Sequence, residues 1–255
     1  MKKLPAFALI SILVLLIDLE LASAQSFNLN SFITQDSIPT ILFNPPQDDK
    51  KPDKTTGAGS RDDRQCPQDT QNDAAQTGSP QPPLQALVPP DNYGVTFSEH
   101  PTFWVYIPET SATQIVLSLK EEGIKPHWQV FLPITGVSGI FGFKLGEESQ
   151  PLEIGKNYQW AVVMVCGDQP GPNDPVTTAW VRRVLRSQQL DDSLNWLEQA
   201  VWYGKQGIWY DALTALAQAR QLQPNNSKLM RDWAEFLSSV ELKAIATEPL
   251  EPITD

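Results

Sequence analysis

Acid–base or nucleophilic chemistry in this chain would depend on two histidines, because His100 and His127 are the whole histidine content of its 255 residues. A serine or cysteine nucleophile needs such a base beside it. His100 lies in the turn Ser98–Pro101, and His127 follows Pro126 at the start of an expected strand. We interpret both as turn or edge residues. A metal site formed by both histidines with Glu99 would require them to meet in space, which the sequence leaves open.

Acidic pairs and a glycine-rich stretch offer two other kinds of chemistry. A glycosidase needs two carboxylates that flank the bond to be cleaved, whereas Glu121–Glu122 and Glu147–Glu148 are adjacent in expected turns, where acids are usually solvated. The stretch Gly57–Cys66 could form an anion-binding nest, but it lacks the preceding strand and following helix of a phosphate loop. We interpret it as a turn that brings Cys66 to the folded domain. An enzyme is not expected, and no catalytic, cofactor-binding or metal-binding residue is assigned.

The N-terminus has the pattern of a secretory signal peptide over residues 1–24. Two lysines precede an apolar run from Leu4 to Ile17, and Ala22–Ala24 supplies the small residues that signal peptidase recognises. The run is shorter than the ~20 residues needed to cross a bilayer. We expect a mature protein that is periplasmic or secreted to the cell surface and does not span the membrane after cleavage. An uncleaved signal anchor is the alternative.

Two cysteines, Cys66 and Cys166, form an even set in a chain that we expect to be exported. Because oxidising compartments favour pairing, we predict a disulfide between them. It would close a loop of about a hundred residues, worth up to ~4.7 kcal/mol in the chain-entropy model. The alternative is a pair of buried or intermolecular thiols.

Composition argues against one class of partner and predicts an unstructured segment before the folded domain. Lys and Arg total 19 against 30 Asp and Glu, a net charge of -11, which disfavours a nucleic-acid-binding face. Residues 25–83 lack hydrophobic periodicity and are rich in Pro, Asp, Gln and Thr. Such a segment buries too little apolar area to offset the entropy of ordering it. We therefore predict a disordered arm.

Residues 84–185 have the sequence pattern of a β-sandwich, with short apolar and aromatic runs separated by Pro, Gly and Asp. The run Tyr158–Cys166 is apolar on both faces, as in a central strand, and Leu152–Tyr158 resembles the approach to a tyrosine corner. Seven strands in about a hundred residues predict an immunoglobulin-like sandwich. The expected strands are 93–98, 101–107, 113–120, 127–132, 139–145, 157–166 and 176–185.

Residues 190–247 change to a helical period and predict a small helical tail, which makes the fold class α+β. Gly207 separates a first helix from a second, which ends at Pro224. Small and bulky residues fall where a tetratricopeptide unit has them. Since three or more such repeats are usually needed for stability, the tail must pack against the β domain or against a partner. The expected caps are Asp192 or Ser193 for the first helix and Asn226 or Ser227 for the third.

The first tail helix has two apolar stripes. The stripe expected to pack against the second helix consists of Trp196, Ala200 and Tyr203. The predicted partner-binding stripe, with Lys205 at its end, consists of Leu194, Leu197 and Val201. A helix that is apolar all round is normally buried. Either the β domain, docked across the short 186–191 connection, or a partner segment must therefore cover the second stripe.

Several segments match a known family in order and spacing. They are Gly59–Arg61 with Cys66, Pro101–Pro108, Gly155–Cys166, Trp180–Arg183, Gly207–Leu213 and Asp232–Ala234. Over roughly residues 57–250 the chain resembles the exported, mainly cyanobacterial family known as domain of unknown function 928 (DUF928). The resemblance implies no established activity and no catalytic residue. It implies that this protein is encoded near sensor proteins with extracytoplasmic CHASE-type domains and near secretion components.

We expect a non-catalytic, exported protein–protein interaction or adaptor module of the cell envelope. Its partner would be an envelope protein, such as a sensor with an extracytoplasmic domain or a secretion component. The alternative is a cell-wall glycan-binding module. Since most rings on sandwich strands fill the core, glycan binding is the second hypothesis. It would use aromatic residues of the expected strands, namely Trp104, Tyr106, Trp128, Trp160 and Trp180.

Signal peptidase should cleave between Ala24 and Gln25, because Ala22 and Ala24 occupy the two positions that the enzyme reads before the cleaved bond. N-terminal sequencing of the exported protein is expected to begin at Gln25. An exported protein that begins at Met1 would overturn the compartment and the inferences that depend on it.

Overall fold

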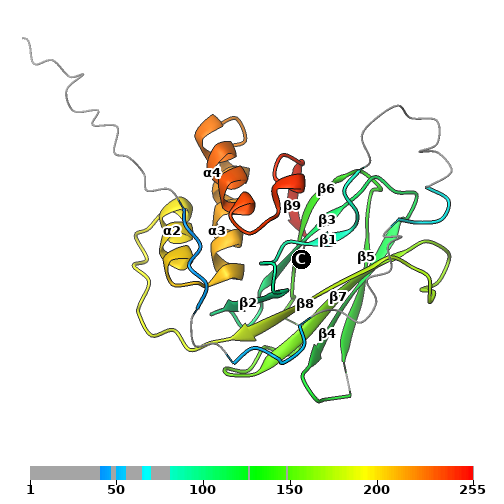
Figure 1. Cartoon of the computed structure of the whole chain (residues 1–255), viewed down its shortest axis with the longest axis horizontal. Helices are drawn as coiled ribbons and strands as arrows, with labels where there is room; N and C mark the ends of the chain where they lie inside the picture. The colour runs from blue at the N-terminus through cyan, green and yellow to red at the C-terminus, as the bar shows by residue number, and fades with distance from the viewer. Residues whose placement is uncertain are drawn as a thin grey trace, which may run out of the picture. The chain divides into compact units, whose positions relative to one another are not determined.

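Two β-sheets form a sandwich with three α-helices at one end, in the part of the chain that the computed structural model describes (Figure 1). Residues 39–255 group into one unit by their contacts, and residues 1–38 into another. The expected signal peptide lies outside the described residues. These are 41–46, 50–55, 65–69, 81–125, 127–147 and 149–254.

The first sheet has the strand order β1-β3-β6-β9. Its central pair, β3 and β6, is antiparallel, and β9 joins β6 in parallel. It therefore combines strands that precede the helices with one that follows them. The strands are β1 (Gln85–Ala86), β3 (Thr102–Ile107), β6 (Gly139–Lys144) and β9 (Leu250–Thr254).

The second sheet has the order β2-β8-β7-β4-β5. Its neighbours are antiparallel except for β2 and β8, which are parallel. The central position of β7 agrees with the apolar character of both of its faces. The strands are β2 (Tyr93–Thr96), β4 (Gln114–Glu121), β5 (Trp128–Pro133), β7 (Asn157–Val165) and β8 (Val176–Arg183).

The sandwich predicted from the sequence is confirmed, and the seven expected strands correspond to β2–β8 within a few residues. Alternation explains the agreement: Ile115, Leu117 and Leu119 of β4 are buried on one face. The expected corner is also present, since the backbone N–H of Glu153 donates to the hydroxyl of Tyr158 at 3.0 Å. The two strands that the sequence did not indicate are β1 and β9.

Three helices follow the sandwich, as expected. They are α2 (Trp196–Lys205), α3 (Trp209–Leu222) and α4 (Ser227–Ser238), followed by a short 3-10 turn at Lys243–Ile245. Asn226 caps α4. The predicted cap of α2 is wrong: Asn195 accepts from two backbone N–H groups and forms a capping box with Glu198, because the chain around Ser193 is engaged in a turn on Asp191.

Helix α3 is fastened to the sandwich by Tyr210, which is 1% exposed. Its hydroxyl accepts a hydrogen bond from Nε1 of Trp160 at 2.7 Å and donates one to the carbonyl oxygen of Trp180 at 2.9 Å. We call these three residues the tyrosine node. The node connects α3 to both β7 and β8, strands in the middle of the second sheet.

Two further indole groups attach α3 to the first sheet. Nε1 of Trp209 donates to the carbonyl oxygen of Leu87 at 2.9 Å, and Nε1 of Trp104 donates to the hydroxyl of Thr214 at 3.0 Å. Glycine at position 94 permits this close approach, since a Cβ there would lie 3.0 Å from the Tyr210 ring and crowd it. The helices and both sheets consequently share one hydrophobic core.

The prediction of a disordered arm over 25–83 is wrong for the parts of it that the structure describes. Ile41 is 3% exposed in the common core, and Cys66 is fully buried. The carbonyl oxygen of Lys50 accepts from Arg182 at 3.0 Å. These segments are ordered by a few apolar anchors and by backbone hydrogen bonds to the sandwich, features that composition alone does not reveal.

Replacing Tyr210 by Phe should lower the free energy of unfolding by about 1–3 kcal/mol, because a buried indole N–H and a carbonyl oxygen lose their partner. Urea denaturation measures this change. Tyr203→Phe is the matched control, since its hydroxyl makes no hydrogen bond to the described residues and its removal should cost little. Equal losses in the two variants would contradict a specific role for the node.

Candidate functional site

Three of the predicted partner-binding residues belong to α2, and Leu194 precedes its N-cap Asn195; the four differ in exposure. Leu194 and Leu197 are half-buried, Val201 is buried in the core cluster, and Lys205 is exposed at the end of the helix. Leu194 and Leu197 are therefore partly accessible, whereas other residues of the chain cover Val201.

An extended segment of the arm, residues 41–46, lies against the end of α2 at Gly204, and we call it the strap (Figure 1). The backbone N–H of Asn44 donates to the carbonyl oxygen of Gly204 at 3.1 Å, and Gly204 lies three residues beyond Val201. A Cβ at Gly204 would lie 2.7 Å from the Leu42 carbonyl oxygen, so only glycine admits the strap. Phe43 anchors it with an edge contact to Trp209 at 4.9 Å.

Trp196 is less buried than the other two residues of the stripe expected to pack against the second helix. Ala200 and Tyr203 are buried as expected, whereas Trp196 is 42% exposed. Trp196 is the first residue of α2. It lies on the wall of a cleft.

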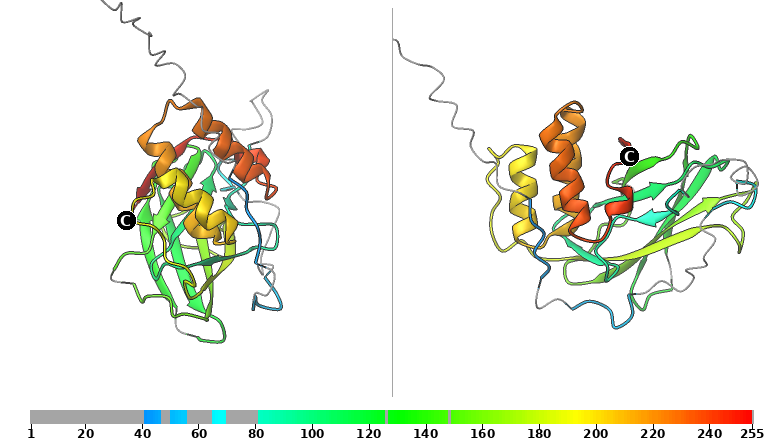
Figure 2. Two further views of the ribbon diagram at one scale, coloured as in Figure 1. Left: turned by 90° about the vertical axis from the view of Figure 1, so that its left-hand side faces the viewer. Right: turned by 45° about the horizontal axis from the view of Figure 1, so that its top comes forward.

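The cleft has a volume of about 610 Å³ and lies between the helices and the sandwich. One wall is formed by α2 and α3, which lie side by side (Figure 2), and the other by the β2–β3 connection and parts of β3, β6 and β9. The sequence indicated neither the cleft nor its lining, because it depends on where the helices meet the sheets. The side chains relevant to its chemistry are His100, Lys144, Trp196, Gln199, Tyr203, Asp211, Gln218 and Gln221.

Asp211 is a titratable group with unusual surroundings in this cleft. Its Oδ2 accepts from the hydroxyl of Thr96 at 2.6 Å and from the backbone N–H of Phe97 at 3.2 Å. Burial raises the pKa of Asp211 to about 6, although these two bonds and the charge of Arg186 oppose the rise. The residue joins the first turn of α3 to the end of β2.

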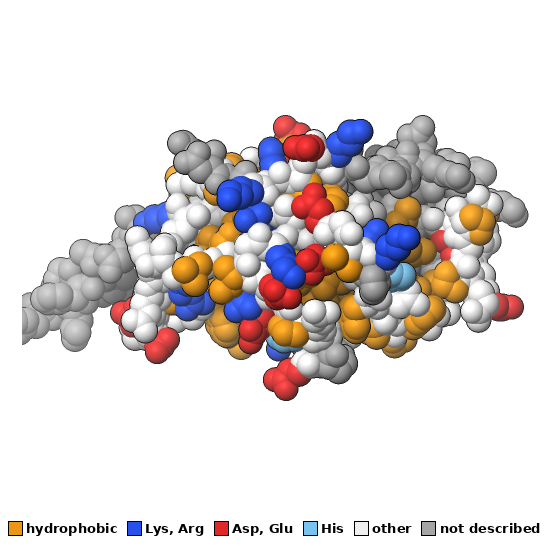
Figure 3. Space-filling view, turned by 90° about the horizontal axis from the view of Figure 1, so that it is seen from below, with side chains coloured by type: hydrophobic (Ala, Val, Ile, Leu, Met, Phe, Trp, Pro, Cys, Tyr) orange, Lys and Arg blue, Asp and Glu red, His pale blue; other side chains and the backbone are white. Residues whose placement is uncertain are grey.

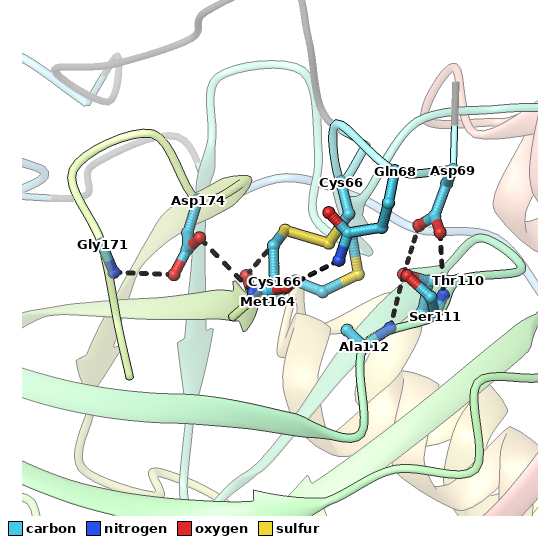
Figure 4. The surroundings of a disulfide bond; sticks show 10 residues. All are labelled: Cys66, Gln68, Asp69, Thr110, Ser111, Ala112, Met164, Cys166, Gly171 and Asp174. Atoms are coloured by element: carbon cyan, nitrogen blue, oxygen red, sulfur yellow. Dashed lines mark hydrogen bonds between the residues drawn. A yellow bond between two sulfur atoms is a disulfide. The ribbon is translucent and has the colours of Figure 1, made fainter. Parts of the chain in front are cut away.

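The predicted disulfide between Cys66 and Cys166 is present, with the Cα atoms 5.4 Å apart (Figure 4). Gln68 reinforces it by donating to the carbonyl oxygen of Cys166 at 2.6 Å. Asp69 accepts from the hydroxyl of Thr110 at 2.6 Å. The bond indicates an oxidising, non-cytoplasmic compartment.

The two histidines occupy separate parts of the sandwich. Nδ1 of His100 lies 3.2 Å from Oγ of Ser149, and Nε2 of His127, beside β5, lies 3.2 Å from Gln129. The pairing of His100 with Ser149 was not predicted. Ser149 is 3% exposed and its hydroxyl donates to the carbonyl oxygen of Gly146 at 2.7 Å, which makes this a structural contact rather than an accessible nucleophile.

The strand aromatics are largely interior. Trp104, Tyr106 and Trp160 are at most 1% exposed, and Trp128 and Trp180 pack partly buried against the core. A ligand cannot stack on the first three rings without unfolding the sandwich.

The surface carries no large field of one sign on the face drawn in Figure 3, where basic and acidic side chains are intermingled with apolar ones. Within the described ranges, no group of three or more His, Cys, Asp or Glu side chains is placed to hold a metal ion. None of the described helices has the length and apolar character needed to cross a bilayer.

Asp211 should make the protein less stable as the pH rises from about 4 to about 6. The folded state holds this proton more tightly than the unfolded state, so the stabilisation is complete below the ordinary pKa and is lost as the pH passes the raised one. Asp211→Asn keeps an acceptor oxygen and has no charge, and should be more stable at pH 7 by about 2 kcal/mol. Urea denaturation at several pH values tests this. Parallel pH profiles for the two proteins would refute it.

Three comparisons relate the chain to known proteins. No curated protein matches the chain. Among solved structures, it is similar to the fn3 domain of the human collagen alpha-1(XX) chain, at 14% identity and a TM-score of 0.26, with 47% of this chain and 98% of that chain covered. The family model described as Domain of Unknown Function (DUF928) matches residues 56–250. The chain therefore belongs to the DUF928 family.

Proposed function

We propose that this protein is a non-catalytic adaptor of the cell envelope that binds an extended segment of another envelope protein along α2. The observation that supports the proposal is the strap, an extended segment already seated on this face of α2. A helix face that accepts one extended segment through a backbone hydrogen bond and apolar anchors has the properties needed to accept another.

The partner segment would replace the strap and run over Leu194 and Leu197 as well. Glycine at positions 204 and 207 leaves room for a backbone, and Gly207 has a φ of +74° that favours glycine. Lys205 stands exposed at the end of the stripe and can contact the partner's flanking residues. The half-burial of Leu194 and Leu197 provides apolar surface that the strap does not bury completely.

The same proposal includes an export signal over residues 1–24 and a periplasmic or secreted location. The disulfide between Cys66 and Cys166 supports this, because such bonds persist in oxidising compartments. A cyanobacterial source with a sensor or secretion component as partner follows from the resemblance noted in the sequence.

The proposal also assigns the sandwich to the immunoglobulin-like type and the helices to a tetratricopeptide-like unit. The contact of Tyr158 with Glu153 supports an immunoglobulin-like sandwich, whereas the parallel pairs β2–β8 and β6–β9 depart from that pattern. The antiparallel packing of α2 on α3 around Gly207 supports a tetratricopeptide-like unit.

A photo-crosslinking amino acid at Lys205 should capture one envelope protein in living cells, and Leu197→Lys should abolish the capture. The added charge would lie against the partner's apolar segment. The melting temperature should fall only modestly, because Leu197 is only partly buried and the lysine chain can extend its ammonium group to water. Mass spectrometry identifies the captured protein.

The matched control places the same crosslinker at Lys120, an exposed lysine of β4. Capture of the same protein from both positions, or capture that survives Leu197→Lys, would count against the adaptor function. A second variant, Phe43→Ser, weakens the strap and should increase capture at Lys205.

A further inference from the structure

The cleft between the helices and the sandwich has the composition of a ligand site, and it uses the side of α2 opposite to the strap. Trp196, Gln199 and Tyr203 follow the spacing of one helix face, whereas Leu197, Val201 and Gly204 lie on another. Its volume of about 610 Å³ is within the range of small-molecule sites.

Trp196 gives the cleft an accessible aromatic surface. At 42% exposure, this tryptophan presents a ring surface on which a ligand can stack. The capping box of Asn195 and Glu198 fixes the helix end that carries the ring. The indole is therefore positioned on the cleft wall in the absence of a ligand.

Three glutamines supply hydrogen-bonding groups around this ring. Nε2 of Gln199 donates to the carbonyl oxygen of Leu194 at 2.8 Å, and Nε2 of Gln221 donates to that of Glu251 at 2.7 Å. Each of these bonds holds a side chain in place and leaves its amide oxygen available for a hydroxyl donor. Gln218 lines the same wall, one turn before Gln221.

The charges of the cleft discriminate among classes of ligand. Its ionisable lining consists of His100, Lys144 and Asp211 with the tyrosines, which gives no cluster of cations for a phosphate or sulfate. The amides and the carboxyl group make it too polar for a purely apolar ligand. A neutral molecule with one apolar face and many hydroxyl groups matches both properties.

We propose that the cleft binds a neutral saccharide, with a sugar ring stacked on Trp196 and its hydroxyl groups bonded to Gln199, Gln218 and Gln221. The C–H groups on one face of a pyranose pack on an aromatic ring, while the equatorial hydroxyls extend to polar neighbours. This site uses none of the strand tryptophans, and it does not depend on the adaptor function of the strap face.

Isothermal titration of the mature protein with cellotetraose, maltotetraose and chitotetraose tests the proposal. At least one of these neutral saccharides is expected to bind with a Kd below about 1 mM, and Trp196→Ala should weaken that binding at least tenfold. Gln218→Ala should weaken it severalfold. Both variants should melt like the parent, since neither side chain is part of the buried core.

Phe131→Ala is the matched control, because this ring on β5 is similarly exposed, at 45%, and does not line the cleft. Binding should be unchanged in Phe131→Ala and in Leu197→Lys, which separates this site from the strap face. The proposal is overturned if none of the three saccharides binds at 10 mM, or if binding persists in Trp196→Ala.

Discussion

The hydrogen-bonded position of Tyr210 between Trp160 and Trp180 is the constraint on which the rest of the structure depends. A buried hydroxyl or indole N–H without a partner costs free energy, so docking of α3 is favoured where these three groups meet. Trp209 on Leu87 extends the same attachment to the other sheet. The helical part thus completes the core of the sandwich rather than forming a tail beside it.

Docking of α3 determines what each side of α2 can do. One side meets the strap, whose backbone fits against Gly204, and the other faces the cleft with Trp196. Asp211 ties the start of α3 to the end of β2 through Thr96, next to the same cleft. Both candidate surfaces therefore follow from one attachment, although they present different chemistry: an apolar stripe on one side and a polar cleft with an exposed ring on the other.

Local patterns in the sequence predicted the parts of the fold that depend on neighbouring residues. Alternation located the strands, and an even number of cysteines predicted the disulfide. The strap was missed because Ile41 and Phe43 lie in a segment rich in Pro and Asp, and their burial depends on residues far along the chain. For the same reason, β9 was not recognised: it has five residues, including Pro252, and pairs with a strand formed much earlier. The helical period placed Trp196 on a face but could not show that this face borders a cleft.

Hydrogen exchange of the whole chain, followed by mass spectrometry at increasing urea, tests most directly whether helices and sandwich form one cooperative unit. If the tyrosine node joins them, the slowest-exchanging amides of α3 and of β7 should open with the same free energy and the same dependence on urea. Opening of α3 at a free energy several kcal/mol lower, with β7 still protected, would show that the helices unfold independently and would contradict this account.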